Sequence, residues 1–292
     1  MKIIAEIKSI VKEGKTLRVI ETEKENKKKE ENERYENRNK RLIEEAENKQ
    51  KILNQNLDYV KIFLRSKDYE GLNKFLRLLT LTHSYRVAEI NLNSIDESPL
   101  QINNCFNLFE EIYSILQSNN IDVEVRSLHF DVHKDDAKII EKFNCTPVFE
   151  KKPDFSIIDR PILLNPWHKN RIIHNLTNIN KQNPLVPHSN EINWYFYPLD
   201  ILLCNGGNHS QLSALLSNDI NQKSQISILQ DLSPLYDVIY FDGSEFKLKA
   251  DNSKIMDASH YIKNQLGIFF EIGRLLKEHS LYFPEYINKW IR

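Results

Sequence analysis

Residues 197–217 read YPLDILLCNGGNHSQLSALLS, and this stretch decides the expected fold of the second half of the chain. The apolar run from Leu199 to Cys204 has the length of a buried strand, and QLSALLS has the character of a helix. Gly206 and Gly207 between them allow a sharp turn and a close approach of the backbone to a ligand. Because the first N–H groups of a helix are unsatisfied and carry partial positive charge, a strand, a glycine turn and a helix start together favour an anion site.

The turn itself supplies the candidate site residues. Gly206, Gly207, Asn208 and Ser210 are the expected ligand contacts, and His209 is the expected acid/base group or phosphate donor, because imidazole titrates near pH 6.5. The spacing is neither a P-loop nor GxGxxG, since GK[ST] is absent. An ordinary turn in which Asn208 or Ser210 caps the helix, with a structural histidine, explains the same residues.

A second polar cluster, NPWHKNR, begins at Asn165 directly after the strand-like PILL. A helix there would place His168, Arg171 and His174 at steps of three residues on one face. A guanidinium group can form two parallel hydrogen bonds to a phosphate. We therefore expect His168 or Arg171 to stabilise developing charge, with Asn165 and His174 as ligand contacts. A solvated helix face is the alternative interpretation.

The order of these elements resembles the ParB N-terminal and sulfiredoxin-like superfamily, whose corresponding turn reads roughly G-x-H-R or G-E-R-R and contacts the phosphates of a nucleotide. Gly207, Asn208 and His209 match by position, and Ala214 stands where the following helix usually has alanine. Ser210 replaces the usual arginine, which removes the strongest phosphate contact. Asn208 stands at the position of the sulfiredoxin thiol, so the resemblance does not imply sulfinic-acid reduction.

The resemblance covers roughly residues 160–245 and implies an α+β fold for that part. Between Gly14 and Gly71 the chain has neither glycine nor proline, and its acidic and basic residues alternate, which predicts a long charged helix over about 18–66. We therefore expect a mainly helical region over 1–150, and a ParB/sulfiredoxin-like α+β domain with a C-terminal helix over 151–292. The chain as a whole also looks like an uncharacterised bacterial family with no assigned activity.

The predicted last helix carries FFEIGR, in which Glu271 and Arg274 stand three residues apart. Such a pair on an apolar helix either points into a ligand site or forms a structural ion pair. No ligand set indicates a metal. The three cysteines, Cys105, Cys145 and Cys204, show no CxxC pair, so neither a disulfide framework nor a thiolate zinc site is indicated and a reducing cytoplasm fits best.

Charge and hydropathy exclude two classes of function. With 40 Lys and Arg against 41 Asp and Glu, the net charge of −1 gives no basic excess for non-specific binding of nucleic acid. No run of about 18 apolar residues exists, so we expect no membrane span and no membrane partner. The sequence predicts a cytoplasmic protein.

Two functions from different classes follow. The first is binding of a nucleotide or a nucleic-acid phosphate, with nuclease or nucleotide-hydrolysing activity as its enzymatic form and a nucleoside triphosphate with Mg²⁺ as the candidate cofactor. Analogy with stand-alone ParB-like domains suggests DNA maintenance or antiphage defence. The alternative is a non-enzymatic adaptor, in which the long helix recruits a protein partner, for instance as a coiled coil, and the domain has lost turnover.

Overall fold

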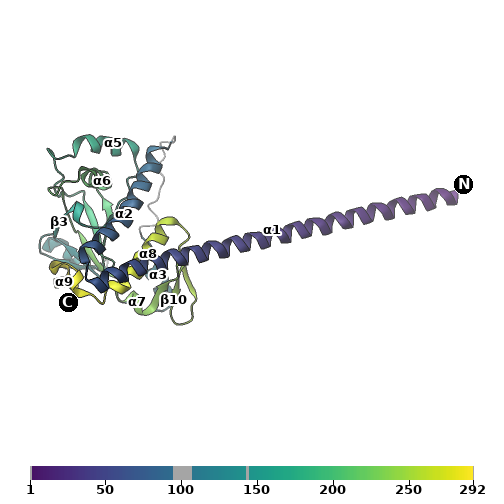
Figure 1. Cartoon of the computed structure of the whole chain (residues 1–292). Coiled ribbons are helices and arrows are strands. Elements are labelled where there is room, and N and C mark those ends of the chain that lie inside the picture. Colours follow the sequence, from purple (N-terminus) through teal and green to yellow (C-terminus); the bar gives the residue numbers. More distant parts are fainter. Residues whose placement is uncertain (1, 95–106, 143–144, 292) are drawn as a thin grey trace. The chain divides into compact units, whose positions relative to one another are not determined.

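The computed structural model describes residues 2–94, 107–142 and 145–291, with side chains for Lys29 and from residue 34 onward within those ranges (Figure 1). The chain divides into two compact units, residues 1–51 and 52–292. Helices and a mixed sheet make it an α+β protein, as the sequence predicts.

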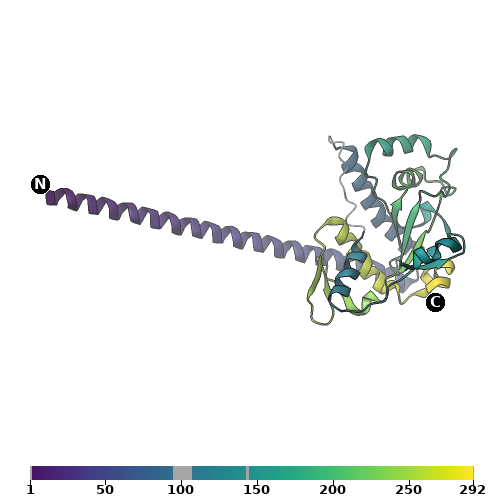
Figure 2. The same ribbon diagram turned by 180° about the vertical axis from the view of Figure 1, so that it is seen from behind.

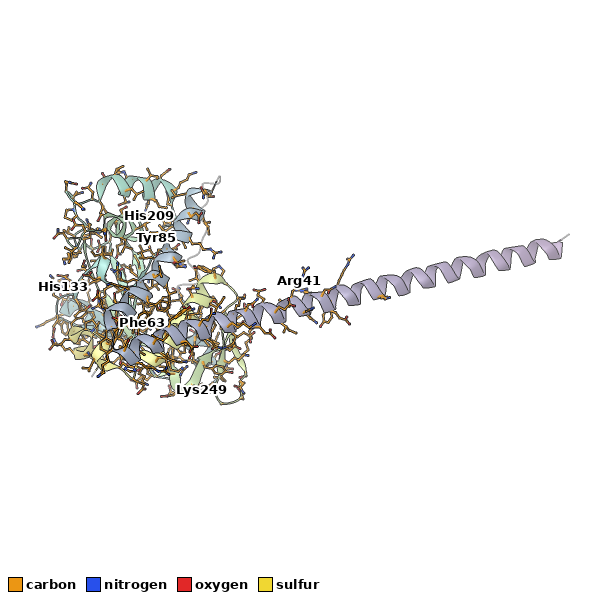
Figure 3. The ribbon with its side chains drawn as sticks, in the orientation of Figure 1. Arg41, Phe63, Tyr85, His133, His209 and Lys249 are labelled. Atoms are coloured by element: carbon orange, nitrogen blue, oxygen red, sulfur yellow. The ribbon has the colours of Figure 1, made fainter. Side chains whose placement is uncertain are left out.

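The first unit is the N-terminal part of one helix, α1 (Lys2–Ser66). From residue 34 to its end the side chains are mostly exposed, and Arg41 projects from the helix in Figure 3. Lys49 pairs with Glu45 one turn away at 3.0 Å, which supports an exposed helix by a few tenths of a kcal/mol. The long charged helix is therefore confirmed, and it begins earlier than the expected residue 18.

The second unit takes the last turns of α1 into its core. Leu53, Val60 and Leu64 are buried there, whereas Leu42, in the first unit, is 54% exposed. The other helices of this unit are α2 (Tyr69–Leu92), α3 (Leu108–Ser118), α4 (Ala137–Lys142), α5 (Lys169–Asn178), α6 (Asn208–Ser217), α7 (Leu235–Val238), α8 (Tyr261–Leu276) and α9 (Glu285–Ile291).

A six-stranded mixed sheet, in the order β2-β1-β8-β5-β6-β4, organises this unit. The pairs β1–β2, β5–β8 and β4–β6 are parallel, and β1–β8 and β5–β6 are antiparallel. Its strands are β1 (Arg126–Phe130), β2 (Cys145–Val148), β4 (Ile162–Leu163), β5 (Ile192–Tyr197), β6 (Ile201–Gly206) and β8 (Ile228–Asp231).

Two smaller sheets complete the unit. One has three strands, β9 (Ile239–Phe241), β10 (Glu245–Leu248) and β11 (Lys254–Asp257), and the other pairs β3 (Asp154–Ser156) with β7 (Lys223–Gln225).

The boundary expected near residue 150 falls inside the large sheet. β1 and β2 precede that position, yet β1 pairs with β8, which follows it. The prolines of the segment CTPVFEKKPDF belong to β2 and to the connection before β3, and they separate strands of one unit instead of two domains. The compact units divide at residues 51 and 52.

β5 lies at the centre of the sheet and positions the site. Its register with β6 shifts between Ile192 and Asn193, and beyond that point Asn193 and Trp194 point to opposite faces. α5 and α6 pack against each other at one end of the unit (Figure 1), and α2 packs against β4 and α5, as the reverse view also shows (Figure 2). Within the described residues, no helix has the length and apolarity needed to cross a membrane.

Candidate functional site

The GGNHS turn has the predicted strand–turn–helix form. β6 ends at Gly206 and α6 begins at Asn208, with Gly207 between them as the helix N-cap at φ +83°. That left-handed backbone favours glycine, because other L-residues are strained there. A Cβ at Gly206 would collide with the carbonyl oxygen of Asn190, so both glycines are dictated by the turn.

The N-terminus of α6 has no side-chain cap. Gly207 offers no side chain, and the amides of Asn208, His209 and Ser210 belong to the first turn, where no intrahelical acceptor exists. Asn208 Oδ1 accepts a bond from the backbone N–H of Asn165 at 2.6 Å, and Ser210 Oγ donates to the Gly207 carbonyl at 2.9 Å. The capping roles that the sequence allowed for Asn208 and Ser210 are therefore not the ones these side chains play.

The two polar clusters meet at His209, whose side chain is only 7% exposed. The backbone N–H of His168 donates to His209 Nε2 at 3.1 Å, so the neutral ring carries its proton on Nδ1. Burial, with the nearby Arg171 and His168, lowers the pKa of His209 to about 4. His209 is thus neutral near pH 7, and its Nδ1–H is the group that the ring can offer as a hydrogen-bond donor.

The three residues of the predicted stripe on α5 lie in different surroundings. His168 is the N-cap of α5, and its Nδ1 accepts from the Arg171 N–H at 3.4 Å. The Arg171 guanidinium lies 5.2 Å from the ring centre of Trp167, whose ring is in edge contact with His209 at 5.6 Å. His174 is exposed, contacts Asn178 and is not among the residues that line the cavity with His209.

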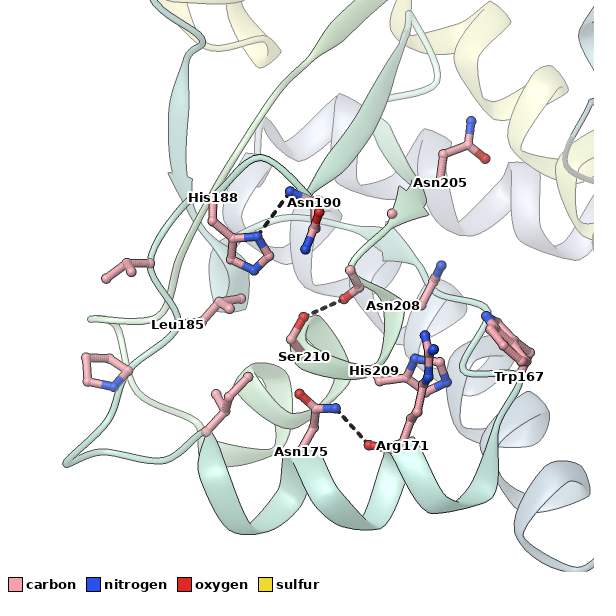
Figure 4. Close-up of a pocket in the computed structure, with 15 residues that line it drawn as sticks. Trp167, Arg171, Asn175, Leu185, His188, Asn190, Asn205, Asn208, His209 and Ser210 are labelled. Carbon is pink, nitrogen blue, oxygen red and sulfur yellow. Dashed lines mark hydrogen bonds between the residues drawn. The ribbon is translucent and has the colours of Figure 1, made fainter.

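A cavity of about 610 Å³ opens in front of the turn. Figure 4 shows Arg171, Trp167 and His209 on one side of it and His188 with Asn190 on the other. Arg171 is the permanently charged side chain of the lining, and no Asp or Glu is among the lining residues, which all belong to the described part of the chain. The lining residues are Trp167, Arg171, Asn175, Ile179, Pro184, Leu185, Val186, His188, Asn190, Asn205, Gly206, Gly207, Asn208, His209 and Ser210.

A buried polar cluster that the sequence did not reveal supports the turn from behind. The carboxyl of Glu191, 0% exposed, accepts from Ser224 Oγ at 2.8 Å, and Gln211 Nε2 on α6 donates to Asn193 Oδ1 at 3.0 Å. Burial raises the pKa of Glu191 to about 7. His188 Nε2 lies 3.4 Å from Glu191 Oε1 and links this cluster to the cavity wall.

Glu271 and Arg274 lie elsewhere and form the structural alternative of their prediction. Arg274 Nε contacts Glu271 Oε2 at 2.7 Å, and its other nitrogens donate to the carbonyls of Tyr236 and Ile239. Glu271 Oε1 accepts from the Phe241 N–H at 2.8 Å. The pair fastens α8 to α7 and β9 and does not line the cavity of the GGNHS turn.

In the described ranges no group of three or more His, Cys, Asp or Glu side chains is arranged to hold a metal ion. Cys145 and Cys204 are free thiols, and Cys105 lies outside the described residues.

The comparisons with known proteins identify a family. Residues 18–283 match the model of DUF6710, described as a family of unknown function, and the chain therefore belongs to that family. No curated protein and no solved structure matches the chain.

Proposed function

We propose that the cavity in front of the GGNHS turn binds the phosphate group of a nucleotide. The observation that carries this proposal is the meeting of an uncapped helix N-terminus and Arg171 in one cavity whose lining has no carboxylate among the described residues. Backbone amides at a helix start and a guanidinium both favour a multiply charged oxyanion. The Nδ1–H of the neutral His209 adds a third kind of donor.

The size and lining of the cavity support a nucleotide over a free phosphate. A volume of about 610 Å³ lies in the usual range for small-molecule sites and is larger than an inorganic anion needs. Trp167 offers an aromatic ring, and Asn175, Asn190 and Asn205 offer amide groups of both polarities. These groups suit a base and a sugar.

We propose binding, with turnover as the less supported form of the same function. His188 Nδ1 accepts the Asn190 N–H at 3.1 Å, as His209 Nε2 accepts that of His168, so each imidazole lacks a free lone pair for a general base. If Mg²⁺ accompanies a nucleoside triphosphate, its protein ligands would be the amide oxygens of the lining and the phosphates would supply the rest. The ParB/sulfiredoxin-like assignment and a role in DNA maintenance or antiphage defence remain proposals that rest on the residues of the turn. A cytoplasmic location is a further proposal, and it rests on the pattern of cysteines.

A thermal-shift screen against nucleoside triphosphates, with and without Mg²⁺, tests this function. A nucleotide at 100 times its dissociation constant should add about 2.7 kcal/mol to the free energy of unfolding. In Arg171→Gln, affinity should fall about tenfold or more, because a charge-assisted bond is lost. The matched control is Arg65→Gln, at an exposed position outside the cavity. A wild type that no nucleotide stabilises, or full stabilisation of Arg171→Gln, contradicts the proposal.

The adaptor is the second candidate function, and one observation favours it. On the first unit, Leu42 and Ile43 are 54% and 60% exposed and follow a strongly charged stretch of α1, which makes them a candidate apolar site for a partner helix. Deletion of the whole of α1 cannot test this function, because it would remove Leu53, Val60 and Leu64 from the core. Replacement of Leu42 and Ile43 by Ser should abolish partner capture if the adaptor function is right, and should leave nucleotide binding unchanged.

A further inference from the structure

The cavity of the GGNHS turn offers an anion a limited amount of positive charge. Arg171 contributes one full charge, and the N-terminus of α6 contributes the equivalent of about half a charge. None of the lining residues, all within the described part of the chain, is a lysine. His209 is neutral near pH 7, because burial lowers its pKa to about 4. A phosphate monoester carries a charge of about −1.5 to −2 at pH 7, which this site can compensate.

A triphosphate would bring more charge than the site can neutralise. Every additional phosphoryl group adds negative charge, and an ion that leaves water without a compensating charge is costly. Proteins that bind triphosphates through Mg²⁺ usually supply one or two carboxylates to the metal. Among the described residues that line this cavity there is no Asp or Glu. The lining therefore favours a single terminal phosphate group.

The donors at the turn match the oxygens of one phosphate group. His209 is 7% exposed and lines the cavity, and its Nε2 accepts the His168 N–H. Its Nδ1–H has no acceptor among the described residues. The amides at the start of α6 and the guanidinium of Arg171 are the other two kinds of donor. A phosphate monoester presents three terminal oxygens, one for each kind.

An apolar surface lies on the side of the cavity away from Arg171. Figure 4 shows Leu185 on that side, and the segment 184–186 lines the cavity there. The backbone of this segment is held in place, because the Leu185 N–H donates to Gln222 Oε1 at 2.6 Å. Val186 lines the cavity with 61% of its side chain exposed. A planar base placed on Val186 would remove this apolar area from water, which is favourable.

We propose that the ligand of this cavity is a nucleoside monophosphate, bound with its phosphate at the turn and Arg171 and with its base against Val186. This inference rests on the proposed function and narrows it from nucleotides in general to those with one phosphate group. The positive charge of the site, the donors of the turn and the apolar segment 184–186 each match one part of such a molecule.

Isothermal titration calorimetry on the full chain tests the number of phosphate groups. The probes are AMP, GMP, CMP and UMP with the four matching nucleosides and triphosphates, each with and without Mg²⁺. For the base that binds most tightly, the monophosphate should bind wild type about tenfold more tightly than the triphosphate without Mg²⁺, because the extra charge is uncompensated. With Mg²⁺ this preference should narrow and should not reverse. The nucleoside should bind at least about tenfold more weakly than its monophosphate.

A variant and its control test the place of the base. Val186→Ser should weaken binding of the monophosphate about fivefold, because the apolar contact is lost, and should leave the ratio of monophosphate to triphosphate affinity unchanged. The matched control is Ile220→Ser, at a position that is 60% exposed and outside the cavity.

Two results overturn the inference and leave the proposed function standing. One is a triphosphate that binds as tightly as its monophosphate without Mg²⁺, and the other is unchanged affinity for the monophosphate in Val186→Ser. Absence of binding by every nucleotide overturns both the inference and the proposed function.

Discussion

Glu191 lies in an environment unlike that of a typical carboxylate. It lies behind Gly207, where a Cβ added to the glycine would be 3.0 Å from Glu191 Cγ, and Ser224 Oγ is its hydrogen-bond donor. A carboxylate that is fully buried with one donor is poorly solvated, and this raises its pKa to about 7. The protonation state of Glu191 therefore changes near pH 7, directly beneath the proposed phosphate site.

The pH dependence of stability should follow from this shift. A carboxyl with a folded-state pKa near 7, raised from 4.5, stabilises the fold at low pH, and this contribution is lost as pH rises through 7. We expect wild type to lose about 3 kcal/mol relative to Glu191→Gln between pH 4.5 and pH 8. Urea unfolding of both proteins across this range measures the difference, with the exposed Glu285→Gln as the control. A difference that does not vary with pH would show that Glu191 is not desolvated.

At the scale of elements, the sequence predicts what local pattern encodes. Helical spacing and the glycine turn locate α5, β6 and α6 within a residue or two. β5 carries no clear strand pattern, because INWYFY is rich in aromatic residues and lacks alternation, as is typical of a strand covered on both faces. Its burial against β6 and β8 is a property of the fold, and no local pattern encodes it.

The candidate site shows the same division. Gly206, Gly207, His209 and Arg171 could be found because a turn, a helix start and a charge are visible in the sequence. Glu191 could not, since nothing in the sequence places it beside Ser224 or beneath the turn. Contacts between distant segments decide which polar residues are buried, and one of these contacts, the His168 N–H bond to His209 Nε2, decides which ring nitrogen of His209 carries the proton.

The attachment of α8 allows a prediction at this scale. Arg274→Met should lower the free energy of unfolding by about 3 kcal/mol, because it leaves the mostly buried Glu271 without its ion pair. In a double-mutant cycle, adding Glu271→Gln should recover part of that loss. Lys289→Met, which breaks the exposed pair with Glu150, should cost less than about 1 kcal/mol. Nucleotide binding should be unchanged in Arg274→Met, and a loss of binding would restore the ligand-site interpretation of this pair.

On the scale of the whole molecule, the chain has two units of unequal content. Residues 52–292 hold the sheets, the hydrophobic core and the cavity of the GGNHS turn, whereas residues 1–51 are one helix. The family match begins at residue 18 and therefore includes much of the first unit. Because the core and the cavity lie in residues 52–292, we expect that this unit folds and binds its ligand without the first unit.

Removal of residues 1–51 tests this separation. The remaining chain keeps Leu53, Val60 and Leu64 in place, so its midpoint of thermal unfolding should match that of the full chain within about 2 °C. Differential scanning calorimetry measures it. Nucleotide affinity should also be unchanged. A lower melting temperature together with weaker binding would mean that the first unit is part of the fold it precedes.

The register shift between Ile192 and Asn193 places the extra residue of the bulge on β6. Ile192 pairs with Gly206 and Asn193 pairs with Cys204, so Asn205 stands opposite no residue of β5. Asn205 lines the cavity in front of the GGNHS turn. Because side chains alternate along a strand, loss of this one residue would turn the end of β6 to the opposite face of the sheet, and the chain would leave the strand for α6 in a different direction.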